Sequence, residues 1–147
     1  MSVVGGVYEY ISADSTITDQ LGTYDFGDGS EPAIFTKEPA NADSGNPLIT
    51  ITQVGGSLGS GRDRGHRGGE VTIDIKIWHD KDASLKDLRE LADDVWLAMD
   101  RSVFNIDDFE MVYCLSTPPS SINDPDGFPG YVISCRILVR ELDDIGS

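Results

Sequence analysis

The sequence has few of the residues that mark a disulfide scaffold or a membrane protein. Two cysteines in 147 residues cannot form a disulfide framework. No apolar run approaches the roughly 20 residues that a helix needs to span a bilayer. The N-terminal stretch also lacks the basic start and continuous apolar segment of a signal peptide, because Gly5, Gly6, Glu9 and Asp14 interrupt it. These absences predict a soluble protein of a reducing compartment.

Basic residues are also scarce. The chain has 11 Lys and Arg against 26 Asp and Glu, which gives a formal net charge of -15. Tight binding to DNA or to anionic lipid depends on clustered Lys and Arg, so the composition argues against both. Hydrophobic residues make up 39% and charged residues 25%, as in ordinary globular proteins. We therefore expect one acidic domain over residues 1–147, which can bury roughly 68–70% of its unfolded surface.

Helical periodicity is clearest between residues 85 and 99. One apolar stripe runs along this segment at i, i+3, i+4 and i+7 spacing, formed by Leu85, Leu88, Leu91, Ala92, Val95, Trp96 and Met99. Ser84 stands at the N-cap position and Asp87 at the third helical position, which approximates a capping box. This helix is expected to be the main cover of the sheet, with Trp96 facing inward and Asp93 and Asp94 in water.

A weaker helix is predicted at the N-terminus. It has apolar residues at helical spacing, namely Val3, Val4, Val7, Tyr8 and Ile11. Gly5 and Gly6 lower its helix propensity. A second, short helical turn carries Ile17, with Asp14 or Ser15 as its cap.

Period-two alternation predicts the strands, at residues 33–36, 48–54, 71–78, 109–115 and 131–139. The inward positions of the last two are expected at Phe109, Met111, Tyr113 and Leu115, and at Tyr131, Ile133, Cys135, Ile137 and Val139. Residues 55–69 contain seven glycines and join two of these strands as a long hairpin tip. The predicted fold is α+β: a mainly antiparallel sheet of about four strands, covered on one face by two helices, with a long β-hairpin arm.

The same alternation places the two cysteines on opposite faces of the sheet. Cys135 has the parity of the inward positions, whereas Cys114 lies between Tyr113 and Leu115 and is expected to face outward. Side chains on opposite faces cannot easily form a disulfide, so both residues are predicted to be free thiols.

Motifs for catalysis are absent or incomplete. His66 and His79 are the only histidines, and neither stands in a setting typical of nucleophilic catalysis. Residues 56–63 resemble the glycine-rich phosphate-binding loop, which ends in Lys and then Ser or Thr and opens a helix. Here Arg62 replaces the lysine of that motif, Asp63 replaces its Ser or Thr, and a strand follows instead of a helix. We expect no catalytic residue and no enzyme activity.

Metal-binding motifs fail the same test. A calcium loop in register with Gly127 would put Ile122 and Ile133 at positions that require oxygen ligands. No Cys/His cluster has the spacing of a zinc site. We expect neither a metal nor a cofactor.

The glycine-rich arm carries a local excess of positive charge. Arg62, Arg64 and Arg67 lie in residues 55–69, with only Asp63 opposing them. A solvated hairpin tip would account for these charges. So would a flexible arm that reaches a carboxylate-rich neighbour, for instance another copy of the protein, because arginine makes planar contacts with carboxylates.

The order of elements resembles that of the tail-completion, or tail-terminator, proteins of long-tailed bacteriophages. An Ala-Asp-x-x-Ile turn precedes a short strand, then a long hairpin leads into Val-Thr-Ile-Asp-Ile-Lys-Ile-Trp-His-Asp at residues 71–80. The helix Leu-Lys-Asp-Leu-Arg-Glu-Leu-Ala-Asp-Asp-Val-Trp-Leu-Ala-Met-Asp follows at residues 85–100, before two closing strands. The resemblance covers nearly the whole chain.

The resemblance implies a structural virion protein in the tail or neck, made in the host cytoplasm. Such proteins form a ring, usually hexameric, that ends polymerisation of the tail tube and joins the tail to the head connector. The partners would be further copies of the chain, the tail tube protein and the head-completion or connector protein, without a membrane. A hexamer would carry about -90 charges, and an acidic channel would let DNA pass without specific binding.

The expected assembly interface combines the arm arginines with the outward face of the sheet. Its candidate residues are Arg62, Arg64, Arg67, Asp74, Lys76, Arg136 and Arg140. Two other functions remain open from the sequence. One is a head-completion or stopper protein of the same neck, and the other is a small hydrolytic or ligand-binding α+β domain.

Overall fold

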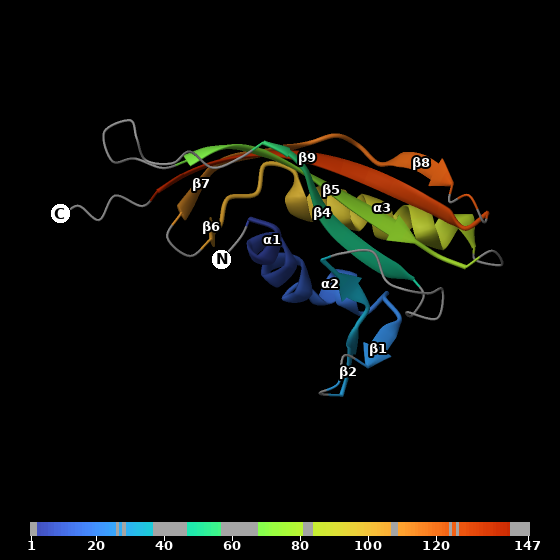
Figure 1. The fold of residues 1–147 in the computed structure, drawn as a ribbon. Helices are drawn as coiled ribbons and strands as arrows, with labels where there is room; N and C mark the ends of the chain where they lie inside the picture. The colour runs from blue at the N-terminus through green and yellow to red at the C-terminus, as the bar shows by residue number, and fades with distance from the viewer. Residues whose placement is uncertain are drawn as a thin grey trace.

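The computed structural model describes residues 3–25, 27, 29–36, 47–56, 68–80, 84–106, 109–123, 125 and 127–141. Within them the helices are α1 (Val3–Ser12), α2 (Ser15–Thr18) and α3 (Leu85–Met99) (Figure 1). The strands are β1 (Thr23–Asp25), β2 (Ser30–Pro32), β3 (Ile34–Phe35), β4 (Leu48–Gly56), β5 (Gly68–Trp78), β6 (Asn105–Ile106), β7 (Phe109–Ser116), β8 (Ser120–Asn123) and β9 (Pro129–Glu141). No helix in these ranges is long and apolar enough to cross a membrane.

Seven strands form one sheet in the order β3-β4-β5-β9-β7-β6, and β8 pairs with β9 beside this path. Every pairing is antiparallel except that of β3 with β4. The α+β class and the mainly antiparallel sheet are thus confirmed. The four long strands were predicted, whereas the short β6 and β8 were not, so the expectation of about four strands was too low.

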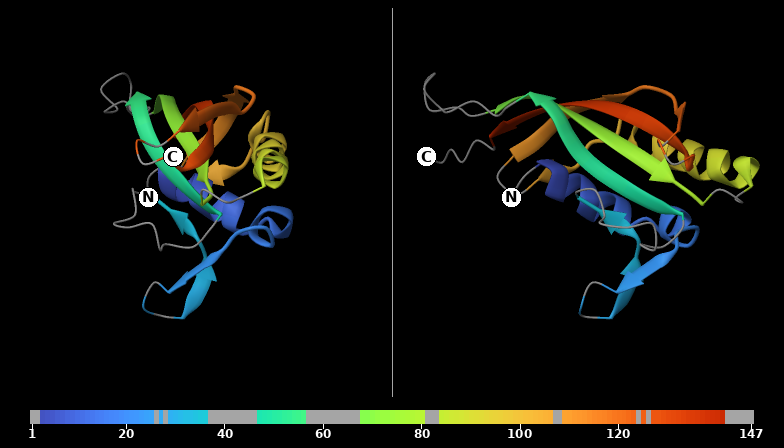
Figure 2. Two further views of the ribbon diagram at one scale, coloured as in Figure 1. Left: turned by 90° about the vertical axis from the view of Figure 1, so that its right-hand side faces the viewer. Right: turned by 45° about the vertical axis from the view of Figure 1, so that its right-hand side comes forward.

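The helices α1 and α3 lie on the same face of the sheet, as predicted (Figure 2). Helix α1 packs against β3, β4 and β6, and α3 packs against β5, β7 and β9. The alternation in β5 explains the core between these layers, because Val71, Ile73, Ile75 and Ile77 are all buried beneath the helices. We call this the inner face of the sheet and the opposite one the outer face.

Helix α3 begins where its sequence signals place it. The side chain of Ser84 accepts a hydrogen bond from the Asp87 amide at 3.3 Å, which is the expected N-cap. Leu88, Leu91, Ala92, Val95 and Met99 are buried in the core. Leu85 was wrongly assigned to this stripe: it is the first residue of α3 and is 62% exposed, and burial along the helix begins at Leu88.

The polar and aromatic residues of α3 differ partly from expectation. Trp96 is half-buried and packs against the core from its margin, and its indole nitrogen has no hydrogen-bond partner among the described residues. Asp93 and Asp94 are also half-buried. Asp93 accepts a hydrogen bond from the Arg89 side chain at 3.1 Å, and Asp94 accepts one from the side-chain amide of Gln20 at 2.8 Å.

Helix α1 forms despite its two glycines because one of them permits close packing. A Cβ atom on Gly6 would lie 2.7 Å from a side-chain carbon of Ile106 in β6. Only glycine at this position lets the helix approach the strand so closely. The following turn is capped by Asp14, whose side chain accepts a hydrogen bond from the Thr16 amide at 2.9 Å.

Strand β7 contains a bulge that the sequence analysis missed. The register with β9 shifts between Met111 and Tyr113, so Val112 has no direct partner. The extra residue reverses the alternation, and the predicted inward orientation of Tyr113 and Leu115 is wrong. Leu115 is 46% exposed, while Cys114 is buried.

The bulge also corrects the argument about the cysteines. Cys114 and Cys135 are both buried in the core, so they share the inner face instead of lying on opposite faces. Cys114 lies opposite Ile137, and Cys135 lies opposite Ser116, which makes the two cysteines diagonal neighbours. Diagonal positions are roughly 7–8 Å apart at Cα, beyond the usual span of a disulfide. Both thiols are free, as predicted, but for this different reason.

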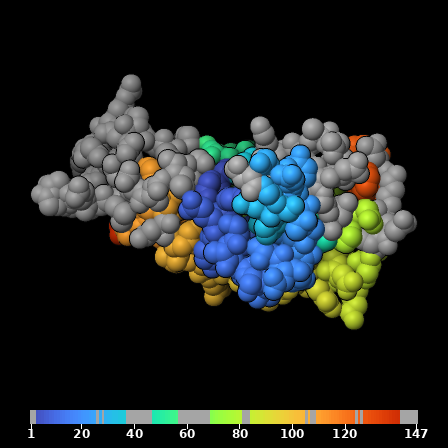
Figure 3. Space-filling view, turned by 90° about the horizontal axis from the view of Figure 1, so that it is seen from below, coloured from blue at the N-terminus to red at the C-terminus, as the bar shows by residue number. Residues whose placement is uncertain are grey.

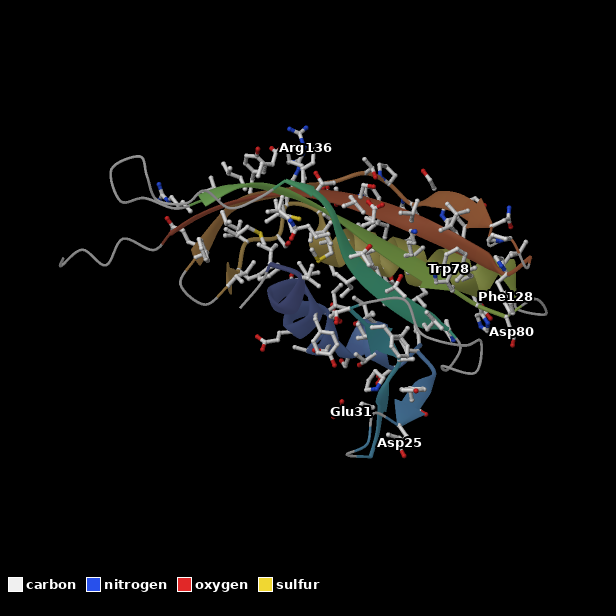
Figure 4. All side chains as sticks on the ribbon, viewed as in Figure 1. Asp25, Glu31, Trp78, Asp80, Phe128 and Arg136 are labelled. Atoms are coloured by element: carbon white, nitrogen blue, oxygen red, sulfur yellow. The ribbon has the colours of Figure 1, made fainter. Side chains whose placement is uncertain are left out.

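A small hairpin of β1 and β2 projects from the helical side of the molecule, away from the sheet (Figure 1). It was not predicted, because glycine and proline dominate this stretch. Asp25 and Glu31 lie near its tip (Figure 4). Seen from below, α1, α2 and this hairpin cover the middle of the helical side (Figure 3).

Candidate assembly surface

The structure brings four of the predicted interface residues together on the outer face. Asp74 and Lys76 lie on β5 and are half-buried, and Arg136 and Arg140 lie on β9 and are exposed. The side chain of Arg136 points away from the helical layer (Figure 4). All four lie on the central pair of strands but are spread along it: Arg140 lies opposite Gly68 at one end, and Lys76 lies opposite Val132 toward the other.

Arg136 already has a partner within its own chain. Its guanidinium group donates to both carboxylate oxygens of Glu70, at 3.3 and 3.1 Å. The hydroxyl of Tyr113 donates to the same carboxylate at 2.5 Å. The hydrogen bond from Tyr113, and then that from Arg136, lowers the pKa of Glu70 below its usual range. The three residues thus form a cross-strand network that joins β5, β9 and β7.

Arg140 is paired in the same way. Its side chain donates to Glu110, which lies directly opposite on β7. Both partners, Glu70 and Glu110, were missed by the sequence analysis, since they are found only once the register is known. The two arginines are therefore less available to a neighbouring subunit than their sequence positions indicated.

Asp74 and Lys76 differ in their surroundings. The Asp74 carboxylate accepts a hydrogen bond from the Ser134 hydroxyl at 2.7 Å. Lys76 makes no ion pair with any residue in the described ranges. Both line an open hollow of about 440 Å³ on the outer face, together with Trp78 and residues of β8 and β9.

The outer face also exposes apolar side chains. Val112 is 44% exposed at the bulge, and Leu115 lies opposite Arg136. These side chains adjoin the network of Glu70, Tyr113 and Arg136. This part of the outer face thus combines two exposed aliphatic side chains with charges that are paired within the chain.

The arm arginines Arg62, Arg64 and Arg67 lie outside the described residues. What the structure does describe is the hairpin that carries the arm. Strands β4 and β5 pair up to Gly56 and Val71, and extend further than the predicted 48–54 and 71–78. Gly56 has a φ of +81°, and a Cβ there would lie 2.1 Å from the backbone oxygen of Glu70, so only glycine fits this end of β4.

The residues considered for catalysis do not form a catalytic arrangement in the described part of the chain. His66 lies outside it. The Nδ1 atom of His79 accepts a hydrogen bond from the Asp80 amide at 2.8 Å, which is a local contact with the next residue. His79 borders a hollow of about 270 Å³ that Asp87, Glu90 and Leu91 also line.

Metal ligation is likewise not indicated by the residues that the structure describes. No group of three or more His, Cys, Asp or Glu side chains among them is placed to hold a metal ion. The buried thiols are an unsuitable pair: contact with Cys114, and then burial, raises the pKa of Cys135 well above its usual range.

The comparisons with known proteins bear on the fold. No family model matches the sequence, and no curated protein matches it. Among solved structures, a chain from the "virion of native gene transfer agent (GTA) particle" is similar, with a TM-score of 0.64 and 13% sequence identity. The match covers 95% of this chain and 99% of that one. At this identity the likeness shows that the two chains share a fold over almost their whole length.

Proposed function

We propose that this protein is a structural component of a phage-like virion. More specifically, we propose that it is a tail terminator: a ring at the head-proximal end of the tail tube that ends polymerisation and joins the tail to the head connector. The observation that carries the proposal is the shared fold with a chain of a gene transfer agent virion, over 95% of this chain. We propose no catalytic activity.

Two features of the described residues support an assembly role. The outer face carries exposed aliphatic side chains beside an ordered charge network, at the centre of a sheet whose other face is covered by helices. The high negative charge also suits a channel through which DNA slides, since it disfavours adhesion to phosphates.

The proposal predicts a closed cyclic oligomer, most simply a hexamer, in the assembled particle. Native mass measurement over a range of protein and salt concentrations tests it, because screening by salt weakens the repulsion between acidic subunits. Addition of the protein to polymerising tail tube protein should then limit tube length, with the ring at one tube end. A strict monomer that binds singly to its partner would overturn the ring.

The same preparations separate the alternatives. A head-completion or stopper protein would bind empty heads in preference to tail tubes. A hydrolytic or ligand-binding domain would saturate with a small molecule as a monomer, in one of the two open hollows described above.

The arm is tested by replacing Arg62, Arg64 and Arg67 with Ser. We expect the subunit to remain folded, but ring assembly or the attachment of the ring to the tail should weaken. Each ion pair of the arm is weak, but the pairs repeat around a ring and are all lost together. Retention of naked DNA should hardly change. Normal assembly at physiological salt would make the arm a solvated loop, and normal assembly with loss of DNA retention would instead assign the arginines to the channel.

A further inference from the structure

The hollow on the outer face is a shallow trough across three strands. Lys76 and Trp78 of β5 form one wall and Ile122 of β8 forms the other, with β9 between them. Trp78 lies opposite Gly130 in the register. A Cβ on Gly130 would lie 2.5 Å from the indole ring, so the missing side chain lets Trp78 lie close over β9.

The trough offers one ammonium group beside apolar surface. Lys76 is half-buried and has no ion-pair partner in the described ranges, whereas the nearby Asp74 carboxylate is held by Ser134. Trp78, Ile122 and Val132 supply the apolar surface. These groups suit a short extended peptide in which a carboxylate stands next to aliphatic side chains.

The chain itself contains such a segment. Residues 142–145, Leu-Asp-Asp-Ile, follow directly on β9 and combine two carboxylates with two aliphatic side chains. In an extended segment, Asp143 and Ile145 point to the same side, so one carboxylate and one aliphatic group face the same surface. We propose that the trough receives residues 142–145 of a second copy of this protein.

The geometry requires the second copy. Glu141 ends β9 nine residues beyond Val132, a separation of about 30 Å along an extended strand. Asp144 is three residues further on and reaches at most roughly 11 Å from Glu141. The chain cannot place these residues in its own trough. The trough lies toward the β8 end of the sheet, whereas β9 ends at the opposite end (Figure 1).

Repeated from head to tail, a contact between one end of a subunit and the other end of its neighbour is heterologous, and such contacts form a ring when the rotation between subunits closes. The inference therefore rests on the proposed function and names one subunit contact of the ring. It also gives Lys76 a role that the self-paired Arg136 and Arg140 do not have.

Zero-length carbodiimide cross-linking of the full chain tests the contact. In an equimolar mixture of ¹⁴N- and ¹⁵N-labelled protein, we expect mixed-isotope cross-links from Lys76 to Asp143 or Asp144. Cross-links of Lys76 only within one chain, for example to Asp124 or Asp126, would overturn the inference. So would the absence of any cross-link from Lys76.

A peptide-binding experiment separates this inference from the ring itself. A labelled peptide of residues 141–147 is titrated against the full chain carrying Asp143→Asn and Asp144→Asn, with fluorescence anisotropy as the readout. We expect saturable binding that Lys76→Ser weakens roughly three- to tenfold. The matched control Lys86→Ser, at a site on α3 that is 83% exposed, should bind as before.

The outcomes distinguish the two proposals. If rings form but the peptide does not bind, or binds equally to the Lys76→Ser variant, the trough is not the docking site and the ring stands. If the peptide binds as expected while the protein never forms a ring or limits tube length, the docking site stands and the terminator role falls.

Discussion

Leu91 offers the most direct test of how helix α3 is held to the sheet. Its side chain is 1% exposed and belongs to the core between α3 and the inner face. Replacement by Ala removes apolar atoms worth about 2.4 kcal/mol, at about 0.8 kcal/mol for each of three carbon groups. The space left behind adds a cavity cost of about 24 cal/mol per Å³ where neighbours do not relax.

One feature of the site reduces the cavity cost. Leu91 also lines the open hollow beside His79, so water reaches one side of the space that its side chain vacates. We therefore expect Leu91→Ala to lower the free energy of unfolding by about 2–4 kcal/mol, within the usual range for such truncations. Urea denaturation at low protein concentration, followed by circular dichroism, measures this change.

The helix provides a matched control. Leu97→Ala removes the same atoms from the same helix, but Leu97 is 67% exposed. Helix propensity changes equally in both variants, so only the burial differs. The Leu97 variant should stay within about 0.5 kcal/mol of the parent protein. Equal losses in the two variants, or a loss below about 1 kcal/mol for Leu91→Ala, would refute the assignment of the buried stripe.

Three further predictions follow from particular backbone and hydrogen-bond geometries. Arg101 has a φ of +60° after α3, so Arg101→Gly should raise the free energy of unfolding by about 0.5–1 kcal/mol in urea, whereas Arg101→Ala should not. Gly130→Ala should lower the free energy of unfolding by about 1–3 kcal/mol and shift the fluorescence of Trp78, since the new methyl group overlaps the indole. Tyr113→Phe should raise the pKa of Glu70 back toward 4.5, because the hydrogen bond from Tyr113 is the largest cause of its lowering. The stability that this depressed pKa contributes is present above pH 4.5 and is lost as pH falls through the folded-state pKa. The urea midpoints of the Tyr113→Phe variant and the parent protein should therefore differ more at pH 7 than at pH 3. A difference that does not change with pH would contradict the link between Tyr113 and Glu70.

Long periodic segments were predictable because burial acts on many residues at once. Strand β5 alternates from Val71 to Ile77, and α3 has both a stripe of buried residues and a cap, so neither segment could bury its apolar side chains in another register. The layer arrangement follows from these faces. The short strands β6 and β8 contain two and four residues, too few for alternation to be visible.

The bulge at Val112 could not be predicted for a different reason. No glycine or proline marks it, and the residues around it alternate as they would in a regular strand. The bulge leaves one residue of β7 without a partner on β9. The contacts that stabilise it involve residues of β5 and β9 that are distant in sequence. The local pattern of apolar and polar residues contains no information on those distant contacts.

The bulge nevertheless decides much of the candidate surface. It turns Tyr113 outward, where its hydroxyl reaches Glu70, and it places Leu115 beside Arg136 on the outer face. The same reversal turns Cys114 inward to the core. One inserted residue thus accounts for the buried thiol, the cross-strand network and the exposed aliphatic group.

The pairing of Arg136 and Arg140 within the chain changes which charges can join subunits. A neighbour that used either arginine would have to displace Glu70 or Glu110, and would then leave that carboxylate without its cation in an already acidic protein. Exposed pairs return only about 0–1 kcal/mol each, so such an exchange has little net gain. Cations without a described partner are better suited to contacts between subunits. On the outer face Lys76 is in this position, and for this reason the contact between copies is best sought at its trough.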